Sequence, residues 1–168
     1  MVFDRWWQNI QRLHESGIDT HCMCTINALC LETLPELVNR IMTKRIEYGN
    51  RRFAIMSFNI LRFPSFQSPL VLDNSIKQRH VKRLLELRQR WTSEQGHIDS
   101  PDVFHEFETG QLDRLINYLK VVDVPHNDSF DMLRLHNDFK KFYQQYDVRR
   151  NKNFTKTFPE LETWYENL

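Results

Sequence analysis

Three clustered cysteines are the first residues whose types could bind a metal. They are Cys22, Cys24 and Cys30. Thiolates hold zinc and iron–sulfur clusters, but the spacing C-x-C-x5-C matches no strong ligand pattern. Alternation along the segment puts Cys22 and Cys24 on its apolar side, where buried cysteine behaves as a small hydrophobic residue. We therefore expect structural thiols and no metal site, with a small Cys/His metal protein as the weaker alternative.

The other residues capable of chemistry form no catalytic motif. The seven histidines match neither H-E-x-x-H nor H-x3-H, although His21 could share a face with Met23, Thr25 and Asn27. A rim or core histidine is the simpler interpretation. Carboxylates are plentiful, but no pair has a spacing typical of acid–base catalysis. With only four glycines, neither G-x-G-x-x-G nor a Walker A string is present.

Basic and aromatic residues are interleaved in two places. The first group consists of His80, Lys82, Arg83, Arg88 and Arg90, and the second consists of Tyr146, Arg149, Arg150, Lys152, Phe154, Lys156 and Phe158. Such a mixture can bind single-stranded nucleic acid through phosphate pairing and base stacking. The net charge of only +1 argues against that partner and favours a solvated helix face and a tail whose aromatic residues dock on the body.

Composition indicates one water-soluble domain. The chain has 168 residues, of which 40% are hydrophobic and 27% charged, values typical of globular proteins with a real core. No segment approaches the length of a membrane span, and the N-terminus lacks the basic start and apolar run of a signal peptide. The odd number of cysteines, without an export signal, favours reduced thiols in the cytoplasm.

Two short units of hydrophobic periodicity organise residues 1–72. Apolar residues at helical spacing predict a helix over residues 3–13, with Gly17 just past its end. A second helix is predicted to carry Leu34, Leu37, Val38, Ile41 and Met42, with Gly49 beyond its end. Alternation predicts strands over Ile18–Asn27 and Arg52–Leu61. A strand, a helix and a strand form a right-handed βαβ unit with parallel strands. The chain therefore begins with a helix that no strand precedes, like an α/β barrel or doubly wound sheet entered part-way round.

The polar ends of the two strands are the candidate site. Thr25 and Asn27 end the first strand, and Ser57 and Asn59 end the second. Ligands of parallel α/β proteins bind at the carboxyl ends of strands. An equally simple interpretation is that polar residues mark where strands enter loops.

After the extended connection over Arg62–Leu72, residues 73–168 are predicted to be almost entirely helical. We expect helix starts at Asn74 or Ser75, at Ser100-Pro101, and at Asn127 or Asp128, with a break near Gly110 and a last short helix after Pro159. The predicted division is thus 1–72 and 73–168.

Two stretches resemble radical S-adenosylmethionine enzymes. The first comprises residues 3–13 (FDRWWQNIQRL), Gly17, residues 18–27 (IDTHCMCTIN) and residues 31–38 (LETLPELV). It is similar to the fourth helix, fifth strand and fifth helix of that family's partial barrel. The second comprises residues 146–154 (YDVRRNKNF) and 157–161 (TFPEL), and it resembles the tail of members with a short twitch extension.

The resemblance implies the C-terminal part of a partial (β/α)6 barrel followed by a mainly helical extension. Arg52–Leu61 would be the last strand, and the missing N-terminal half of the barrel would be its partner. The complete protein would use S-adenosylmethionine and a [4Fe–4S] cluster to form a radical that abstracts hydrogen from an unknown substrate. The family's C-x3-C-x2-C motif is absent from this chain. We therefore expect no cofactor, metal or catalysis from the chain alone, and only wall contacts from Thr25, Asn27, Asn59 and Arg62.

A different class of function stays open. The chain could be a non-catalytic, α-rich binding module that uses its basic and aromatic tail for a protein or nucleic-acid partner. Two parallel strands cannot cover both their faces unaided. If the chain is a fragment, we therefore expect marginal stability or self-association through strand edges.

Overall fold

The computed structural model describes residues 3–92, 106–121 and 131–168, and within them the protein is mixed α/β. The first part consists of α1 (Phe3–Glu15), β1 (His21–Ile26), α2 (Leu34–Tyr48) and β2 (Ile55–Ile60). The predicted order of helix, strand, helix and strand is confirmed. Both strands are shorter than predicted, because residues 18–20 and 52–54 form the connections that lead into them.

Two glycines end the first two helices. Gly17 and Gly49 have φ values of +74° and +58°, in the left-handed region that residues with a Cβ rarely adopt. Gly49 donates its backbone N–H toward the last turn of α2, with Ile46 O as acceptor at 3.1 Å. Pro35 lies in the first turn of α2, where its missing N–H costs no helical hydrogen bond.

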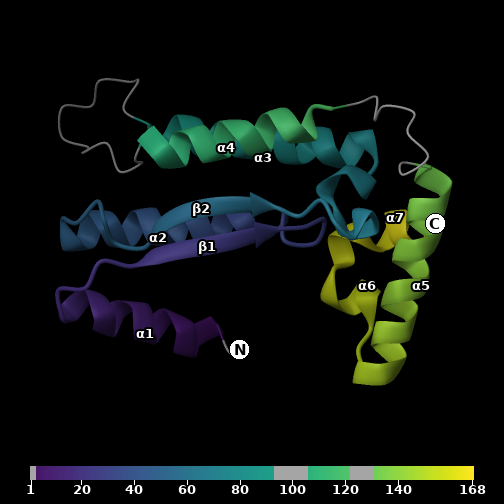
Figure 1. Cartoon of the computed structure of the whole chain (residues 1–168), viewed down its shortest axis with the longest axis horizontal. Coiled ribbons are helices and arrows are strands. Elements are labelled where there is room, and N and C mark those ends of the chain that lie inside the picture. The colour runs from purple at the N-terminus through teal and green to yellow at the C-terminus, as the bar shows by residue number, and fades with distance from the viewer. Residues whose placement is uncertain (1–2, 93–105, 122–130) are drawn as a thin grey trace.

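The sheet is a two-stranded parallel pair in which β1 and β2 align from His21 with Ile55 to Ile26 with Ile60. One face contains Cys22, Ile26, Met56 and Phe58, which are all buried. This is the apolar face that alternation predicts. Figure 1 shows both strands pointing toward the end of the molecule where α5, α6 and α7 lie.

Residues 73–168 form helices in the described part, as predicted. These are α3 (Asn74–Trp91), α4 (Glu106–Leu119), α5 (Met132–Arg150), α6 (Phe154–Thr157) and α7 (Glu162–Glu166), with a 3-10 turn at Pro159–Leu161. Two further 3-10 turns, at Ser65–Gln67 and Pro69–Val71, lie in the connection between β2 and α3. The expected break near Gly110 is wrong, because α4 continues through that residue.

The predicted cap at Ser100-Pro101 and the predicted starts at Asn127 or Asp128 lie outside the described residues. The cap of α5 is Asp131, whose Oδ1 accepts the N–H groups of Leu133 and Arg134 at 3.1 and 3.3 Å. A carboxylate there satisfies donors that have no partner within the helix.

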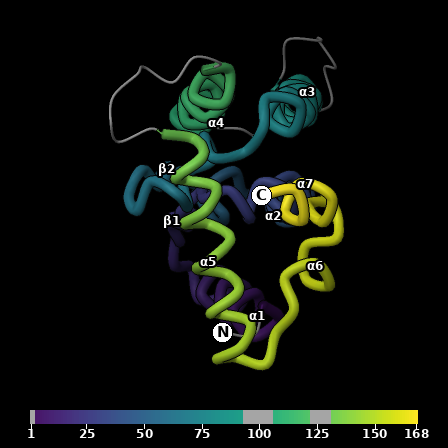
Figure 2. Tube along the Cα trace, turned by 90° about the vertical axis from the view of Figure 1, so that its right-hand side faces the viewer, coloured from purple at the N-terminus to yellow at the C-terminus, as the bar shows by residue number. Residues whose placement is uncertain are grey.

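The helices gather on particular sides of the sheet. Figure 2 shows the molecule viewed along the strands. Helices α4 and α3 lie next to each other above the sheet, on the side of β2, and α1 lies below the sheet, on the side of β1. Trp7 and Ile10 of α1 belong to the same buried cluster as Val38 and Ile41 of α2. That cluster also includes Leu112 of α4 and Phe139 of α5, so buried side chains from both predicted segments pack together. The division at residue 72 stays a prediction.

Candidate functional site

Thr25 and Asn59 are brought together on the face of the sheet opposite the buried one. They are register partners near the carboxyl ends of β1 and β2, and both are exposed. His21 and Met23 share this face, and Met23 is 72% exposed. The Asn59 side-chain amide lies 3.8 Å from Met23 Sδ. A surface of this kind can donate and accept hydrogen bonds. At one end of it the His21 ring contacts Phe107 of α4 edge-on, with ring centroids 6.3 Å apart, whereas Met23, Thr25 and Asn59 are exposed.

Asn27 lies just past β1 and has a local structural role. Its Oδ1 accepts the backbone N–H groups of Leu29 and Cys30, both at 3.0 Å. This arrangement is the turn that asparagine commonly forms with the backbone that follows it. Asn27 therefore shapes the loop after β1, and its amide oxygen is already engaged.

Arg62 lies two residues beyond β2 and is exposed. Its guanidinium carbon lies 5.8 Å from the centroid of the Tyr118 ring, a distance at which a cation is attracted to the ring face. Of the four predicted site residues, Thr25 and Asn59 thus lie side by side. Asn27 belongs to the adjoining loop, and Arg62 contacts α4. Their binding of a cofactor stays a prediction.

The outer edge of β2 is covered by polar side chains of α4. The Met56 N–H donates to Glu108 Oε1 at 2.7 Å, and the Phe58 N–H donates to Gln111 Oε1 at 3.4 Å. The Arg114 guanidinium donates to Phe58 O. Glu108, Gln111 and Arg114 are spaced at i, i+3 and i+6, so they line one side of a helix. Their side chains occupy backbone groups that a further strand would otherwise pair with.

The edge of β1 is different. The Ile55 N–H donates to Thr20 O at 3.0 Å and the Leu61 N–H donates to Ile26 O at 2.8 Å. The even-numbered residues of β1 therefore direct their backbone groups to β2. Those of His21, Met23 and Thr25 point to the opposite edge, because alternate residues of a strand face opposite neighbours. In the described part of the chain, β1 pairs with β2 alone, and the Cys30 thiol is 3.6 Å from Thr25 O.

A buried ion pair anchors α4 to this sheet. Arg45 Nη1 and Nη2 lie 2.7 Å from Glu108 Oε2 and Oε1, and the two side chains are 0% and 1% exposed. Arg45 also donates to Phe53 O at 2.8 Å and to Ala54 O at 3.1 Å. Bidentate geometry with further hydrogen bonds offsets the desolvation of both charges. Glu108 therefore joins α2, α4 and the backbone of β2.

The cysteines have the properties of structural thiols. All three are free, and Cys22 is buried. Burial raises the pKa of Cys22 to about 12 and that of Cys24 to about 11. Burial also raises the pKa of Cys30, opposed by hydrogen bonds from the backbone. A raised pKa keeps each thiol protonated near neutral pH, whereas metal ligation and nucleophilic attack require the thiolate.

The basic side predicted for residues 80–90 is partly wrong. Arg83 pairs with Glu32 at 2.5 Å and Arg88 pairs with Asp113 at 2.8 Å. His80 is buried 3.3 Å from Glu32. Burial is the main cause that lowers its pKa to about 4, so its imidazole is neutral at pH 7. These charges join α3 to the loop before α2 and to α4, and they do not form one free basic surface.

Four residues of the second basic and aromatic group, Tyr146, Lys152, Phe154 and Phe158, line a cavity of about 440 Å³. Its aromatic lining comes from α5, α6 and the residue after α6: Phe142, Tyr143, Tyr146, Phe154 and Phe158. Leu29 after β1 and Gln67 of the first 3-10 turn also line it, which puts the cavity at the carboxyl end of the sheet. The predicted docking of the tail's aromatic residues is confirmed for Phe154, which is buried.

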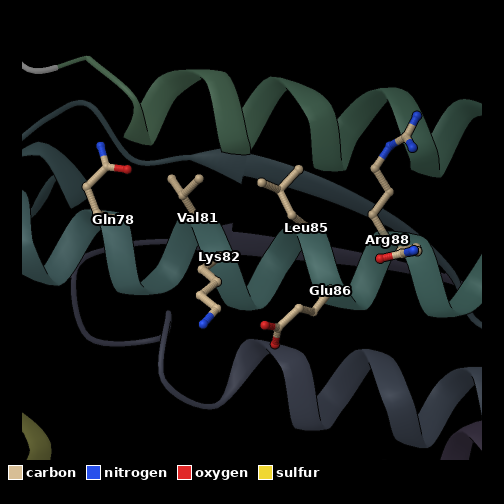
Figure 3. A pocket seen from close by; sticks show the side chains of 7 residues that line it. Gln78, Val81, Lys82, Leu85, Glu86 and Arg88 are labelled. Carbon is tan, nitrogen blue, oxygen red and sulfur yellow. The ribbon is translucent and has the colours of Figure 1, made fainter.

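A second cavity, of about 520 Å³, lies along α3 and is lined by residues of that helix alone. Figure 3 shows Val81 and Leu85 on one side of the helix, with Lys82 and Glu86 on the other. The polar side chains do not converge on one point, so this cavity has no arrangement suited to binding or catalysis.

The described residues contain no group of three or more His, Cys, Asp or Glu that could hold a metal ion. None of the described helices combines the length and apolarity needed to cross a bilayer. Comparison with protein-family models, curated proteins and solved structures finds no match.

Sequence reasoning missed Arg45 and Glu108. Arg45 lies in phase with Val38, Ile41 and Met42 on α2, and Glu108 lies in phase with Leu112 and Leu115 on α4. A charge at a core-facing position of each of two helices, with opposite signs, is a signal that could have identified the pair.

Proposed function

We propose that this chain is the C-terminal portion of a radical S-adenosylmethionine enzyme and supplies part of its barrel wall and its C-terminal extension. The observation that carries the proposal is the difference between the two strand edges. Side chains of α4 occupy the edge of β2, whereas no further strand in the described part of the chain pairs with the outer edge of β1. A sheet of this kind can be extended only past β1.

The direction of extension agrees with the family resemblance. There, the segment containing β2 would be the last strand of a partial (β/α)6 barrel, and the missing N-terminal half would pair with β1. Helix α2 would lie outside the barrel, and the exposed face with His21, Met23, Thr25 and Asn59 would line its interior. Polar side chains near the carboxyl ends of strands are where such barrels bind ligands.

The chain's own cysteines do not fit a [4Fe–4S] cluster. They lack the C-x3-C-x2-C spacing, and burial keeps them protonated. The cluster and S-adenosylmethionine would belong to the missing half, where they supply the radical chemistry. Thr25 and Asn59 would offer hydrogen bonds to a bound ligand, with Arg62 and the loop of Asn27 beside them. This chain alone is expected to be inactive, and its reduced thiols suit the cytoplasm.

The test is to sequence the coding region upstream of Met1. A continuous frame that encodes C-x3-C-x2-C supports the proposal. The extended protein, purified without oxygen, should then show iron–sulfur absorption and cleave S-adenosylmethionine to 5′-deoxyadenosine. A ribosome-binding site and an in-frame stop codon immediately before Met1 would overturn it.

A binding module is the second candidate, favoured by the exposed Arg149, Arg150 and Lys152 at the end of α5. The 168-residue chain would then bind single-stranded RNA with an affinity that falls as salt rises. Changing both Arg149 and Arg150 to Ala should abolish the binding. RNA binding that survives this change would remove the candidate.

A further inference from the structure

The cavity beside α5 has a nearly continuous aromatic wall. The ring centroids of Tyr143 and Phe154 are 5.2 Å apart, as are those of Phe154 and Phe158. Phe142 contacts Tyr143 edge-on at 5.0 Å, and Tyr146 lies 6.4 Å from Tyr143. Tyr143 and Phe154 are buried, whereas Tyr146 is 45% exposed. The aromatic wall thus extends from the core to the surface, where the exposed ring of Tyr146 lies at the opening of the cavity.

The size of the cavity suits a small molecule. Its volume of about 440 Å³ lies within the range of roughly 300–1,000 Å³ that is typical of small-ligand sites. Flat rings along such a wall favour a planar aromatic ligand, because aromatic pairs gain attraction beyond the area they bury.

The charges around the cavity favour an anion. Residues 140–156 contain six basic residues and one acidic residue. Lys152 lines the cavity, and Arg149, Arg150 and Lys156 are exposed on the same stretch. The acidic residue, Asp147, also lines the cavity, and its Oδ2 accepts the Phe154 N–H at 2.7 Å. A cationic ligand would meet this excess of positive charge, whereas a phosphate group would be attracted by it.

We propose that this cavity binds a free mononucleotide, with its base against the aromatic wall and its phosphate toward Lys152. Stacking distinguishes bases poorly, because every base has a π-face. The inference therefore concerns nucleotides as a class and does not name one base. It does not depend on the proposed barrel, because every residue that lines the cavity belongs to this chain.

The test is calorimetric titration of the 168-residue chain with three probes: adenosine 5′-monophosphate, adenosine and inorganic phosphate. We expect the monophosphate to bind most tightly, adenosine more weakly, and phosphate without a detectable signal. This order requires both the aromatic wall and the cation. Absence of binding by the monophosphate at millimolar concentration would overturn the proposal.

Two variants distinguish the contribution of the aromatic wall to binding from that of the Lys152 charge. Tyr146→Ala should weaken binding of both the monophosphate and adenosine by ~5- to ~150-fold, the range found for loss of a single stacked base. Lys152→Gln should weaken binding of the monophosphate and leave that of adenosine unchanged. The matched controls are Phe107→Ala and Lys82→Gln, two exposed residues outside this cavity, and both should bind like the unchanged protein.

Both variant sites are exposed, and far-UV circular dichroism verifies that each variant is folded. Binding that neither variant weakens would place the nucleotide elsewhere and overturn the proposal. A single-stranded oligonucleotide that binds far more tightly than the monophosphate, with a steep salt dependence, would also overturn it. That result would favour the nucleic-acid surface of the second candidate function.

Discussion

The two edges of the small sheet differ in the partners of their backbone groups. A strand edge presents a row of N–H and C=O groups that need partners. At β2, the partners are Glu108, Gln111 and Arg114 of α4. At β1, the backbone of His21, Met23 and Thr25 faces away from the only strand with which β1 pairs in the described residues. A helix can therefore end a parallel sheet by means of its side chains.

Within the described residues, a buried charged side chain bonds to the backbone at the edge of β2 and not at the edge of β1. Glu108 accepts a backbone N–H of β2 from a buried position, where it forms an ion pair with Arg45. Such a pair is costly to break, because removal of one partner leaves the other charge buried. In the described residues, no such ion pair lies at the edge of β1, which is consistent with an edge that receives another strand.

Loss of the acceptor at the edge of β2 should have the largest effect. Glu108→Ala leaves Arg45 buried without its counter-charge and the Met56 N–H without its acceptor. We expect the free energy of unfolding to fall by about 3–5 kcal/mol, as measured by urea denaturation. The control is Glu106→Ala on an exposed position of the same helix. A loss below about 1 kcal/mol would show that the edge does not depend on this pair.

Proline substitutions at two adjacent positions of β1 should distinguish the edge that pairs with β2 from the opposite edge. Cys24→Pro removes an N–H that faces β2, and we expect a loss of about 1–3 kcal/mol for the unpaired acceptor. Met23→Pro removes an N–H that faces outward, so it should cost less and reduce self-association of the chain. Urea denaturation and analytical ultracentrifugation provide the two readouts. Equal losses for both variants would contradict the assigned direction of these groups.

A smaller effect is expected for Gln111→Ala. Its Oε1 is 3.4 Å from the Phe58 nitrogen, a long hydrogen bond at a partly exposed position. The loss in unfolding free energy should be about 0.5–1.5 kcal/mol. Asn117→Ala, on an exposed position of α4, is the matched control. If Gln111→Ala lowers the unfolding free energy as much as Glu108→Ala does, the three α4 side chains together stabilise the edge of β2, and the ion pair is not the main contribution.

The smallest effect is expected on the exposed face of the sheet. Thr25→Val changes a side chain that no described element covers, so the unfolding free energy should stay within about 0.5 kcal/mol of that of the unchanged chain. Thermal denaturation followed by circular dichroism is sufficient for this measurement. A destabilisation above about 1 kcal/mol would indicate that this face is covered.

Local signals in the sequence were strong where periodicity and turn chemistry agree. Gly17 and Gly49 lie at the predicted helix ends, and alternation assigned Met23 and Met56 to opposite faces of the sheet, as observed. Strand bounds were less accurate, because residues that alternate at strand ends continue into connections. The cap of α5 is Asp131, whereas the predicted helix starts at Asn127 or Asp128 lie outside the described residues.

Some features of the candidate site could be predicted from local sequence, and others could not. The register that puts Thr25 beside Asn59 follows from two parallel strands of similar length, so the sequence alone could predict it. The use of Asn27 in a turn, the contact of Arg62 with Tyr118, and the cavity that joins Leu29 to α5 and α6 depend on segments far apart in the chain.

By itself, the sequence determined the order of helices and strands and the buried face of the sheet, because these depend on neighbours a few residues apart. Only the tertiary structure decided which strand edge is closed. That outcome required Glu108 to meet Arg45 and the backbone of Met56 across more than fifty residues of chain. No local pattern specifies such a meeting, because the helix that carries Glu108 could pack in many ways until burial of its apolar side and pairing of its charge select one.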